Sequence, residues 1–341
     1  MDVNRNRYDL HLFLFLIKKI SEKGDILKKI KQMILISVVS VLALVGCTSE
    51  GIDEGSLGEE EKLQVMTTFY PMYEFTKKIV GDSADVRLLV PAGTDSHTYE
   101  PSAKDVGLLN QSDIFIYNSV EMETWVPTVL DSLVENDDLT IVEAANSISL
   151  LENSEEGYDD HEDHGHVHEK DPHVWLDPVL AQEEVHTIKE ALIEVDPKHA
   201  AGYEENALAF IEELKELDDE FTSAFTGASQ RVFVTEHEAF GYLAARYDLT
   251  QVSVAGLSTE NEPSPAQLMD VYKLIQEKNI TTIYTNTNST QTIADTLANE
   301  ADITITALHS LEGVTNEEKE AGEDYLSLMR KNLHALKESI Q

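Results

Sequence analysis

Histidines are concentrated in one short stretch of the chain, residues 161–178, which holds five of the twelve. Four of them lie among acidic residues: His161, His164, His166 and His168. The fifth, His173, opens the run HVWLDP. Neutral imidazole is the commonest protein ligand for zinc and related transition metals. The stretch therefore predicts that this protein handles a transition metal.

Two further histidines follow predicted strands. His97 comes after a strand predicted at residues 85–90, and His237 comes directly after one predicted at 232–235. Ligands of open α/β sheets bind beyond the carboxyl ends of the strands. Each histidine alone is typical of an ordinary surface or core position, but three in such positions, with His173, indicate one site. Three imidazoles leave a tetrahedral zinc ion one open position.

Strand-like and helix-like segments alternate in both halves of the chain. The predicted strands are residues 63–69, 85–90, 114–118 and 140–144, then 232–235, 251–256, 281–285 and 303–308. Such alternation predicts parallel sheets built from βαβ units. Between the halves, residues 199–225 carry apolar side chains at helical spacing, and a helix of that length spans roughly 40 Å. We therefore expect an α/β fold with one lobe on either side of a long helix.

The composition excludes one class of partner. The chain has 64 acidic and 25 basic residues, a formal charge of −39, so the phosphates of nucleic acid would be repelled. Hydrophobic residues make up 42% of the chain, which is enough for packed cores. We interpret most of the acidity as a surface that keeps the protein soluble.

The N-terminal region has the pattern of an export signal. Lysines precede an apolar run at residues 33–45, which is too short to span a bilayer and ends beside Cys47, the only cysteine. The run LVGC resembles the lipobox of bacterial lipoproteins, in which the cysteine is lipidated and becomes the first mature residue. We therefore expect a signal peptide at 1–46, longer than usual at its start, and an anchored flexible tether at 47–62.

Four motifs occur in an order that resembles a known family. They are DSHTYEP at 95–101, HVWLDP at 173–178, HEAFGY at 237–242 and EPSP at 262–265. The chain is similar over roughly 63–341 to the zinc-binding substrate-binding lipoproteins of bacterial metal ABC importers. The stretch YLSLMRKNL at 325–333 is also similar to that family.

The resemblance implies a fold and a ligand set. It implies two Rossmann-like lobes, 63–197 and 228–341, joined by a rigid long helix at 198–227, with a histidine-rich and acidic loop at 152–170. The metal would lie in the cleft between the lobes. Ligands would be His97 and His173 from the first lobe and His237 from the second. Manganese members of the family carry a carboxylate at the third position, so His237 favours Zn²⁺.

The fourth ligand is open at this stage. Many relatives place a carboxylate just after the strand that here reads IYT, but this chain has Asn286 there. The fourth position could hold water, Asn286, or one of the acids beside His237, Glu236 and Glu238. Without the usual carboxylate we expect a less charged site. Asp177 and Glu100, which stand beside the motifs, are candidate partners that orient the imidazoles.

These observations favour a zinc receptor over an enzyme. The expected protein is a monomer on the outer face of the cell membrane, anchored through lipid on Cys47, that captures Zn²⁺ and delivers it to an ABC permease. His161, His164, His166 and His168 would form weak auxiliary sites. The alternatives are a zinc-dependent hydrolase, for which no HExxH motif is present, a manganese-specific binding protein, and an adhesin-type surface lipoprotein.

Overall fold

The computed structural model describes residues 62–133, 138–152, 170–257, 263–287 and 292–341, which belong to one compact unit. The expected signal peptide, Cys47 and the tether lie outside the described residues, as do His161, His164, His166 and His168. Within the described part of the chain, no helix has the length and apolar character needed to cross a membrane.

The N-terminal lobe is built on a parallel sheet of four strands in the order β2-β1-β3-β4. Its elements are β1 (Leu63–Thr67), α2 (Tyr70–Val80), β2 (Ala84–Leu88), α3 (Ala103–Leu109), β3 (Ile114–Tyr117), α4 (Val126–Ser132) and β4 (Thr140–Glu143). All four residues of β3 are buried, as expected for a central parallel strand that is covered on both faces.

The C-terminal lobe repeats this topology, with strands in the order β6-β5-β7-β8. Its elements are β5 (Val232–Thr235), α7 (Gly241–Arg246), β6 (Thr250–Ser253), α8 (Pro265–Lys278), β7 (Thr282–Thr285), α9 (Thr292–Ala301), β8 (Thr304–Ala307), α10 (Asn316–Glu320) and α11 (Tyr325–Ser339). In both sheets every pairing between strands is parallel, so the loops that follow the strands leave each sheet at one edge.

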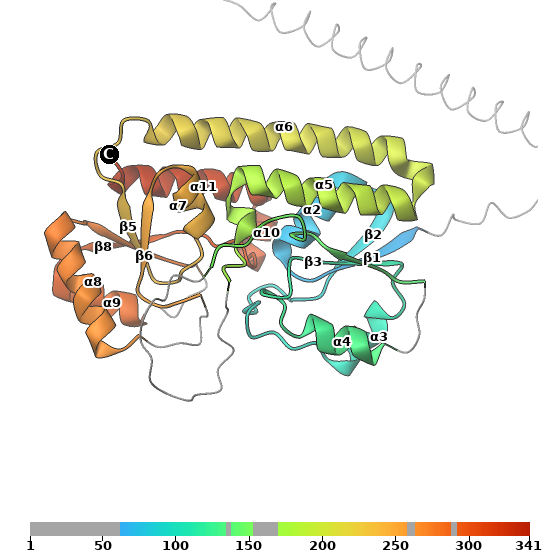
Figure 1. Cartoon of the computed structure of the whole chain (residues 1–341), viewed down its shortest axis with the longest axis horizontal. Coiled ribbons are helices and arrows are strands. Elements are labelled where there is room, and N and C mark those ends of the chain that lie inside the picture. The colour runs from blue at the N-terminus through green and yellow to red at the C-terminus, as the bar shows by residue number, and fades with distance from the viewer. Residues whose placement is uncertain (1–61, 134–137, 153–169, 258–262, 288–291) are drawn as a thin grey trace, which may run out of the picture. The chain divides into compact units, whose positions relative to one another are not determined.

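A layer of long helices spans both lobes. A short 3₁₀ turn (Val174–Leu176) leads into α5 (Pro178–Val195), and a second turn (Pro197–His199) leads into α6 (Ala200–Phe225). Figure 1 shows α6 running over α11 beside the C-terminal lobe and over α5 beside the N-terminal lobe. The predicted fold, two parallel α/β lobes joined by a long helix, is therefore confirmed.

One hydrophobic core crosses the boundary between the lobes. It joins Ile114 of the N-terminal sheet and Phe233 of the C-terminal sheet to the buried stripe of α6, which includes Phe210 and Leu214. The outer face of each sheet has a core of its own, under α3 and α4 in one lobe and under α8 and α9 in the other. Because the shared core would be broken by a large movement of one lobe against the other, the fold favours a fixed arrangement.

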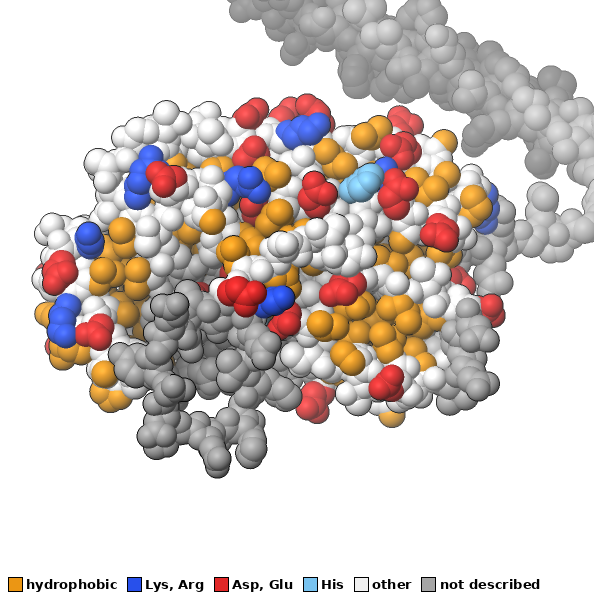
Figure 2. Space-filling view, in the orientation of Figure 1, with side chains coloured by type: hydrophobic (Ala, Val, Ile, Leu, Met, Phe, Trp, Pro, Cys, Tyr) orange, Lys and Arg blue, Asp and Glu red, His pale blue; other side chains and the backbone are white. Residues whose placement is uncertain are grey.

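Acidic side chains are spread over the face of the molecule that Figure 2 shows. Figure 2 shows Asp and Glu scattered across one face of the molecule, with a few Lys and Arg between them. On this face they form no single acidic patch. The distribution fits the interpretation that the acidity keeps the protein soluble.

Candidate metal centre

His97 is held by the loop that follows β2. The Oδ1 atom of Asp95 accepts a hydrogen bond from the His97 backbone N–H at 2.8 Å, which closes a tight turn. The hydroxyl of Ser96 donates to the backbone carbonyl of Glu312 in the other lobe at 3.0 Å. The His97 side chain is 1% exposed. The loop is therefore fixed on the N-terminal side of the histidine, and the imidazole ring is buried between the lobes.

His173 is oriented by a carboxylate two residues earlier in the chain. Oδ1 of Asp171 accepts hydrogen bonds from both the backbone N–H of His173, at 2.9 Å, and its ring Nδ1, at 2.8 Å. Since Oδ1 of Asp171 can only accept, Nδ1 carries a proton, and Nε2 is the ring nitrogen that can bind a metal once it has lost any proton of its own. The ring of His173 is fully buried and lies beside Trp175, with centroids 5.2 Å apart.

His237 follows β5 and is fixed in the same way through a backbone carbonyl. Its Nδ1 lies 3.2 Å from the carbonyl oxygen of Gly256, which can only accept, so Nε2 is again the ring nitrogen that can bind a metal. The His237 carbonyl accepts from the Thr235 hydroxyl at 2.8 Å and from Gln251 Nε2 at 3.0 Å. These contacts hold the residue at the carboxyl end of its strand.

A fourth side chain, Glu312, joins the three histidines from the loop after β8. Leu311 before it has a φ of 58°, a left-handed conformation that few large residues adopt. The Leu311 backbone N–H donates to Nδ1 of His309 at 2.9 Å, which supports this turn. Glu312 is 6% exposed. The turn therefore places the buried carboxylate of Glu312 between the lobes.

The four side chains converge on one point. Oε1 of Glu312 lies 3.4 Å from Nε2 of His97, 3.4 Å from Nε2 of His173 and 3.3 Å from Nε2 of His237. Nε2 of His173 lies 3.4 Å from that of His97 and 3.2 Å from that of His237. A tetrahedron whose corners lie about 2.0–2.1 Å from its centre, the length of zinc–nitrogen bonds, has edges of about 3.3–3.4 Å. Five of the six distances between the donor atoms are therefore close to those of a tetrahedral zinc site, and all four atoms lie within 4.8 Å of one another.

The charges of the cluster favour a cation. Burial alone would raise the pKa of the Glu312 carboxyl, but His97 and the other two imidazoles hold it well below its usual value. Burial lowers the pKa of His173, yet Asp171 and Glu312 outweigh this and raise it to about 9. Burial lowers the pKa of His237. In the metal-free protein, a proton on His173 thus offsets part of the negative charge of Asp171 and Glu312. A bound metal ion would offset the same charge.

Comparison with known proteins gives the family. The chain matches the family of the zinc-uptake complex component A, periplasmic, over residues 65–339. The chain belongs to this family. Among curated relatives of this zinc-uptake component, the "high-affinity zinc uptake system protein ZnuA" of Bacillus subtilis is 41% identical over 309 residues, covering 90% of this chain and 97% of that protein.

Another zinc-uptake relative is longer than this chain. The "zinc-binding lipoprotein AdcA" of Streptococcus pneumoniae is 42% identical over 311 residues, which cover 91% of this chain and 61% of that protein. The chain thus spans about three fifths of the length of AdcA. The crystal structure of the Zn(II)-bound ZnuA-like domain of that AdcA has a TM-score of 0.70 and 42% identity, and covers 82% of this chain and 99% of the domain.

The fourth member of the cluster differs from our expectation of water or Asn286. Asn286 turns its amide to the Ser310 hydroxyl, to which Nδ2 donates at 2.8 Å. Neither Glu236 nor Glu238 belongs to the described cluster. The carboxylate comes instead from Glu312, one strand further along the sheet. The cluster therefore includes a carboxylate, and the expectation of a less charged cluster was wrong.

The orienting groups also differ from those we expected. Asp177 begins α5, where its Oδ1 accepts the backbone N–H of Val179 at 2.8 Å, and it pairs with Arg246 at 2.8 Å. Glu100 is exposed. The group that orients His173 is Asp171, which stands two residues before the histidine. Its position two residues before His173 is the feature of the sequence from which this role could have been predicted.

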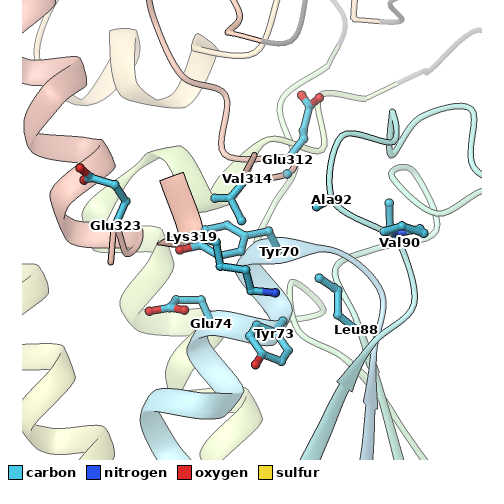
Figure 3. A pocket seen from close by; sticks show the side chains of 12 residues that line it. Tyr70, Tyr73, Glu74, Leu88, Val90, Ala92, Glu312, Val314, Lys319 and Glu323 are labelled. Carbon is cyan, nitrogen blue, oxygen red and sulfur yellow. The ribbon is translucent and has the colours of Figure 1, made fainter. Parts of the chain in front are cut away.

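A hollow of about 90 Å³ lies on the other side of the Glu312 loop. Its walls are α2, the end of β2 and the segment from Glu312 to Glu323. Figure 3 shows that Glu312 points its carboxylate away from the other side chains that line this hollow. The hollow is therefore separate from the metal centre, although Glu312 belongs to both.

Proposed function

We propose that this protein is a zinc receptor that captures Zn²⁺ outside the cytoplasm and delivers it to an ABC permease. The observation that carries the proposal is the buried cluster of three imidazoles and one carboxylate, in which five of the six distances between donor atoms are 3.2–3.4 Å. Membership of a zinc-uptake family supports the same function.

The donor set favours zinc over manganese. Imidazole nitrogen suits zinc, whereas oxygen-rich sites of higher coordination number suit manganese. Only one of the four donors, Glu312, is an oxygen. The proposed selectivity therefore rests on both the ligand types and the tetrahedral spacing.

Four protein ligands also argue against hydrolysis. Catalytic zinc sites keep one position open for the water that attacks the substrate, whereas closed sites have four protein ligands. In this protein Glu312 takes the position that a catalytic water would need. We therefore propose that zinc is bound as cargo and that no reaction occurs on it.

Titration of the metal-free protein tests this function. We expect one tightly bound Zn²⁺ per chain, weak competition by Mn²⁺, and no turnover of ester or peptide substrates by the loaded protein. Replacing His97, His173 or His237 by Ala should each weaken zinc binding strongly. Tight binding that survives all three single substitutions, or a preference for Mn²⁺, would refute the proposed site.

The histidine-rich loop is proposed as an auxiliary collector of zinc through His161, His164, His166 and His168. The residues on either side of it support this role, because Glu152 and Lys170 form an antiparallel bridge and the Asp171 N–H donates to Leu151 O at 2.9 Å. Both ends of the loop thus begin next to the residue that orients His173.

Deletion of residues 155–169 tests the collector role. We expect the tight site to remain and any weaker zinc sites to disappear, because the tight ligands lie outside the deleted segment. An unchanged number of bound zinc ions in the presence of excess metal would contradict the role.

Anchoring through Cys47 completes the proposal. The export-signal pattern before this cysteine and the relative named a lipoprotein support a tether to the outer face of the cell membrane, and we propose that the tethered protein is a monomer. Mass spectrometry of the mature protein should find a chain that begins at a lipidated Cys47. A mature chain with an unmodified Cys47 would contradict the anchor.

A further inference from the structure

Asp171 is held from several directions. Its backbone N–H donates to the Leu151 carbonyl at 2.9 Å, and its carbonyl accepts from the Tyr242 hydroxyl at 2.6 Å. Its Oδ1 accepts from His173, and the side chain is 7% exposed. Since the backbone is fixed on both sides, the carboxylate can move only by rotation of its own side chain.

Gly241 lies against the other carboxylate oxygen. This residue is the first of α7, in the C-terminal lobe, whereas Asp171 belongs to the N-terminal lobe. A Cβ atom on Gly241 would lie 2.7 Å from Oδ2 of Asp171, which is shorter than any ordinary contact between carbon and oxygen. Any side chain at this position would therefore push the carboxylate aside and disturb its 2.8 Å bond to His173 Nδ1.

We propose that Gly241 is a positioning residue of the metal site. Because it has no side chain, α7 can close onto Asp171, and Asp171 then holds His173 with Nε2 toward the metal. This inference rests on the proposed zinc site. It also makes the alignment of a ligand in one lobe depend on a helix of the other lobe.

A double-mutant cycle with zinc affinity as the readout tests the inference. Gly241→Ala should weaken zinc binding about tenfold or more, since partners that orient metal-bound histidines contribute about 10–100-fold to affinity. Asp171→Ala should weaken it by a similar factor. The double variant should bind zinc as Asp171→Ala does, within about threefold, because the carboxylate that the added methyl group would displace is already gone. The inference would be overturned if Gly241→Ala lowered zinc affinity equally in the unaltered protein and in Asp171→Ala. It would also be overturned if Gly241→Ala did not lower the zinc affinity of the unaltered protein.

Two controls complete the cycle. Gly202→Ala, in α6 where a Cβ meets nothing within 4 Å, should leave zinc affinity unchanged. If Gly241→Ala fails to fold, the double variant should fold and bind zinc as Asp171→Ala does, and its failure to do so would count against the inference. The proposed function is tested separately, since it fails only if the unaltered protein does not bind zinc tightly.

Discussion

Asn332 bonds both backbone groups of His309. Its Oδ1 accepts the His309 N–H at 2.7 Å, and its Nδ2 donates to the His309 carbonyl at 2.7 Å. Asn332 lies in α11 and is 2% exposed, whereas His309 begins the turn that carries Glu312 three residues later. A helix outside the turn thus fixes the position of the carboxylate in the metal centre.

Replacing Asn332 by Ala should weaken both stability and zinc binding. The substitution leaves a buried N–H and a buried carbonyl without partners, at about 1–3 kcal/mol each. The released turn should also misplace Glu312. Thermal unfolding of the metal-free protein and a zinc competition titration measure the two effects. His334→Ala, an exposed change on the same helix, should alter neither, and normal zinc affinity in Asn332→Ala would contradict the role in positioning.

Replacing Glu312 by Gln should weaken zinc binding by more than the roughly 10–100-fold that is typical of groups that only orient a ligand. The amide keeps the shape of the side chain but removes the negative charge from the cluster, and a neutral amide oxygen is a poor zinc ligand. Competition with a chelator of known affinity measures the loss. Glu317→Gln, an exposed change nearby, serves as control. A loss smaller than tenfold would exclude Glu312 as a ligand.

Zinc affinity should rise with pH up to about 9. The pKa of His173 is raised to about 9, chiefly by Asp171 and Glu312 against the effect of burial, so below that pH zinc must displace a proton from the ring. We expect about a tenfold gain in apparent affinity per pH unit between pH 7 and 8, with about one proton released per zinc. Calorimetry in buffers of different ionisation enthalpy counts that proton. An affinity independent of pH over this range would contradict the assignment.

Replacing Glu184 by Gln should stabilise the metal-free protein at alkaline pH. Both carboxylate oxygens of Glu184 are buried and have no hydrogen-bond partner among the described residues. Burial, with the charge of Glu123, raises its pKa well above the usual value. The folded state therefore keeps a proton that the unfolded state loses, and stability falls as pH rises above the unfolded pKa of about 4.5.

The gain from Glu184→Gln should accordingly be largest near pH 8 and small near pH 4.5. Melting temperatures at both pH values measure it, and a rise of at least about 2 °C at pH 8 is expected, on the scale of about 2–4 °C per kcal/mol. Glu183→Gln, the exposed neighbour on α5, should have little effect at either pH. A lower melting temperature for Glu184→Gln at pH 8 would contradict the account.

The fold was predictable because its signals are local. Apolar runs such as IFIY in β3 identify buried parallel strands, and Ser102 with Asp105 forms the capping box that begins α3. The apolar spacing of residues 199–225 predicted α6 to within one residue. These patterns depend only on residues that are close in the sequence, so they can be recognised without knowledge of tertiary contacts.

The metal centre was only partly predictable. The rule that ligands follow the carboxyl ends of parallel strands selected His97 and His237, since histidines are few. The same rule applied to β8 would have included Glu312. However, the chain has 64 acidic residues, so an acidic residue after a strand does not by itself indicate a metal ligand. Its position depends on the left-handed Leu311 and on Asn332 from a separate helix, and no local pattern reports those contacts.

A crystal structure of the zinc-loaded protein, with anomalous diffraction recorded at the zinc absorption edge, tests the central claim most directly. We predict one strong anomalous peak at about 2.0–2.1 Å from Nε2 of His97, His173 and His237 and from Oε1 of Glu312. A loaded crystal in which this position holds no zinc, while zinc is bound tightly elsewhere, would contradict the claim.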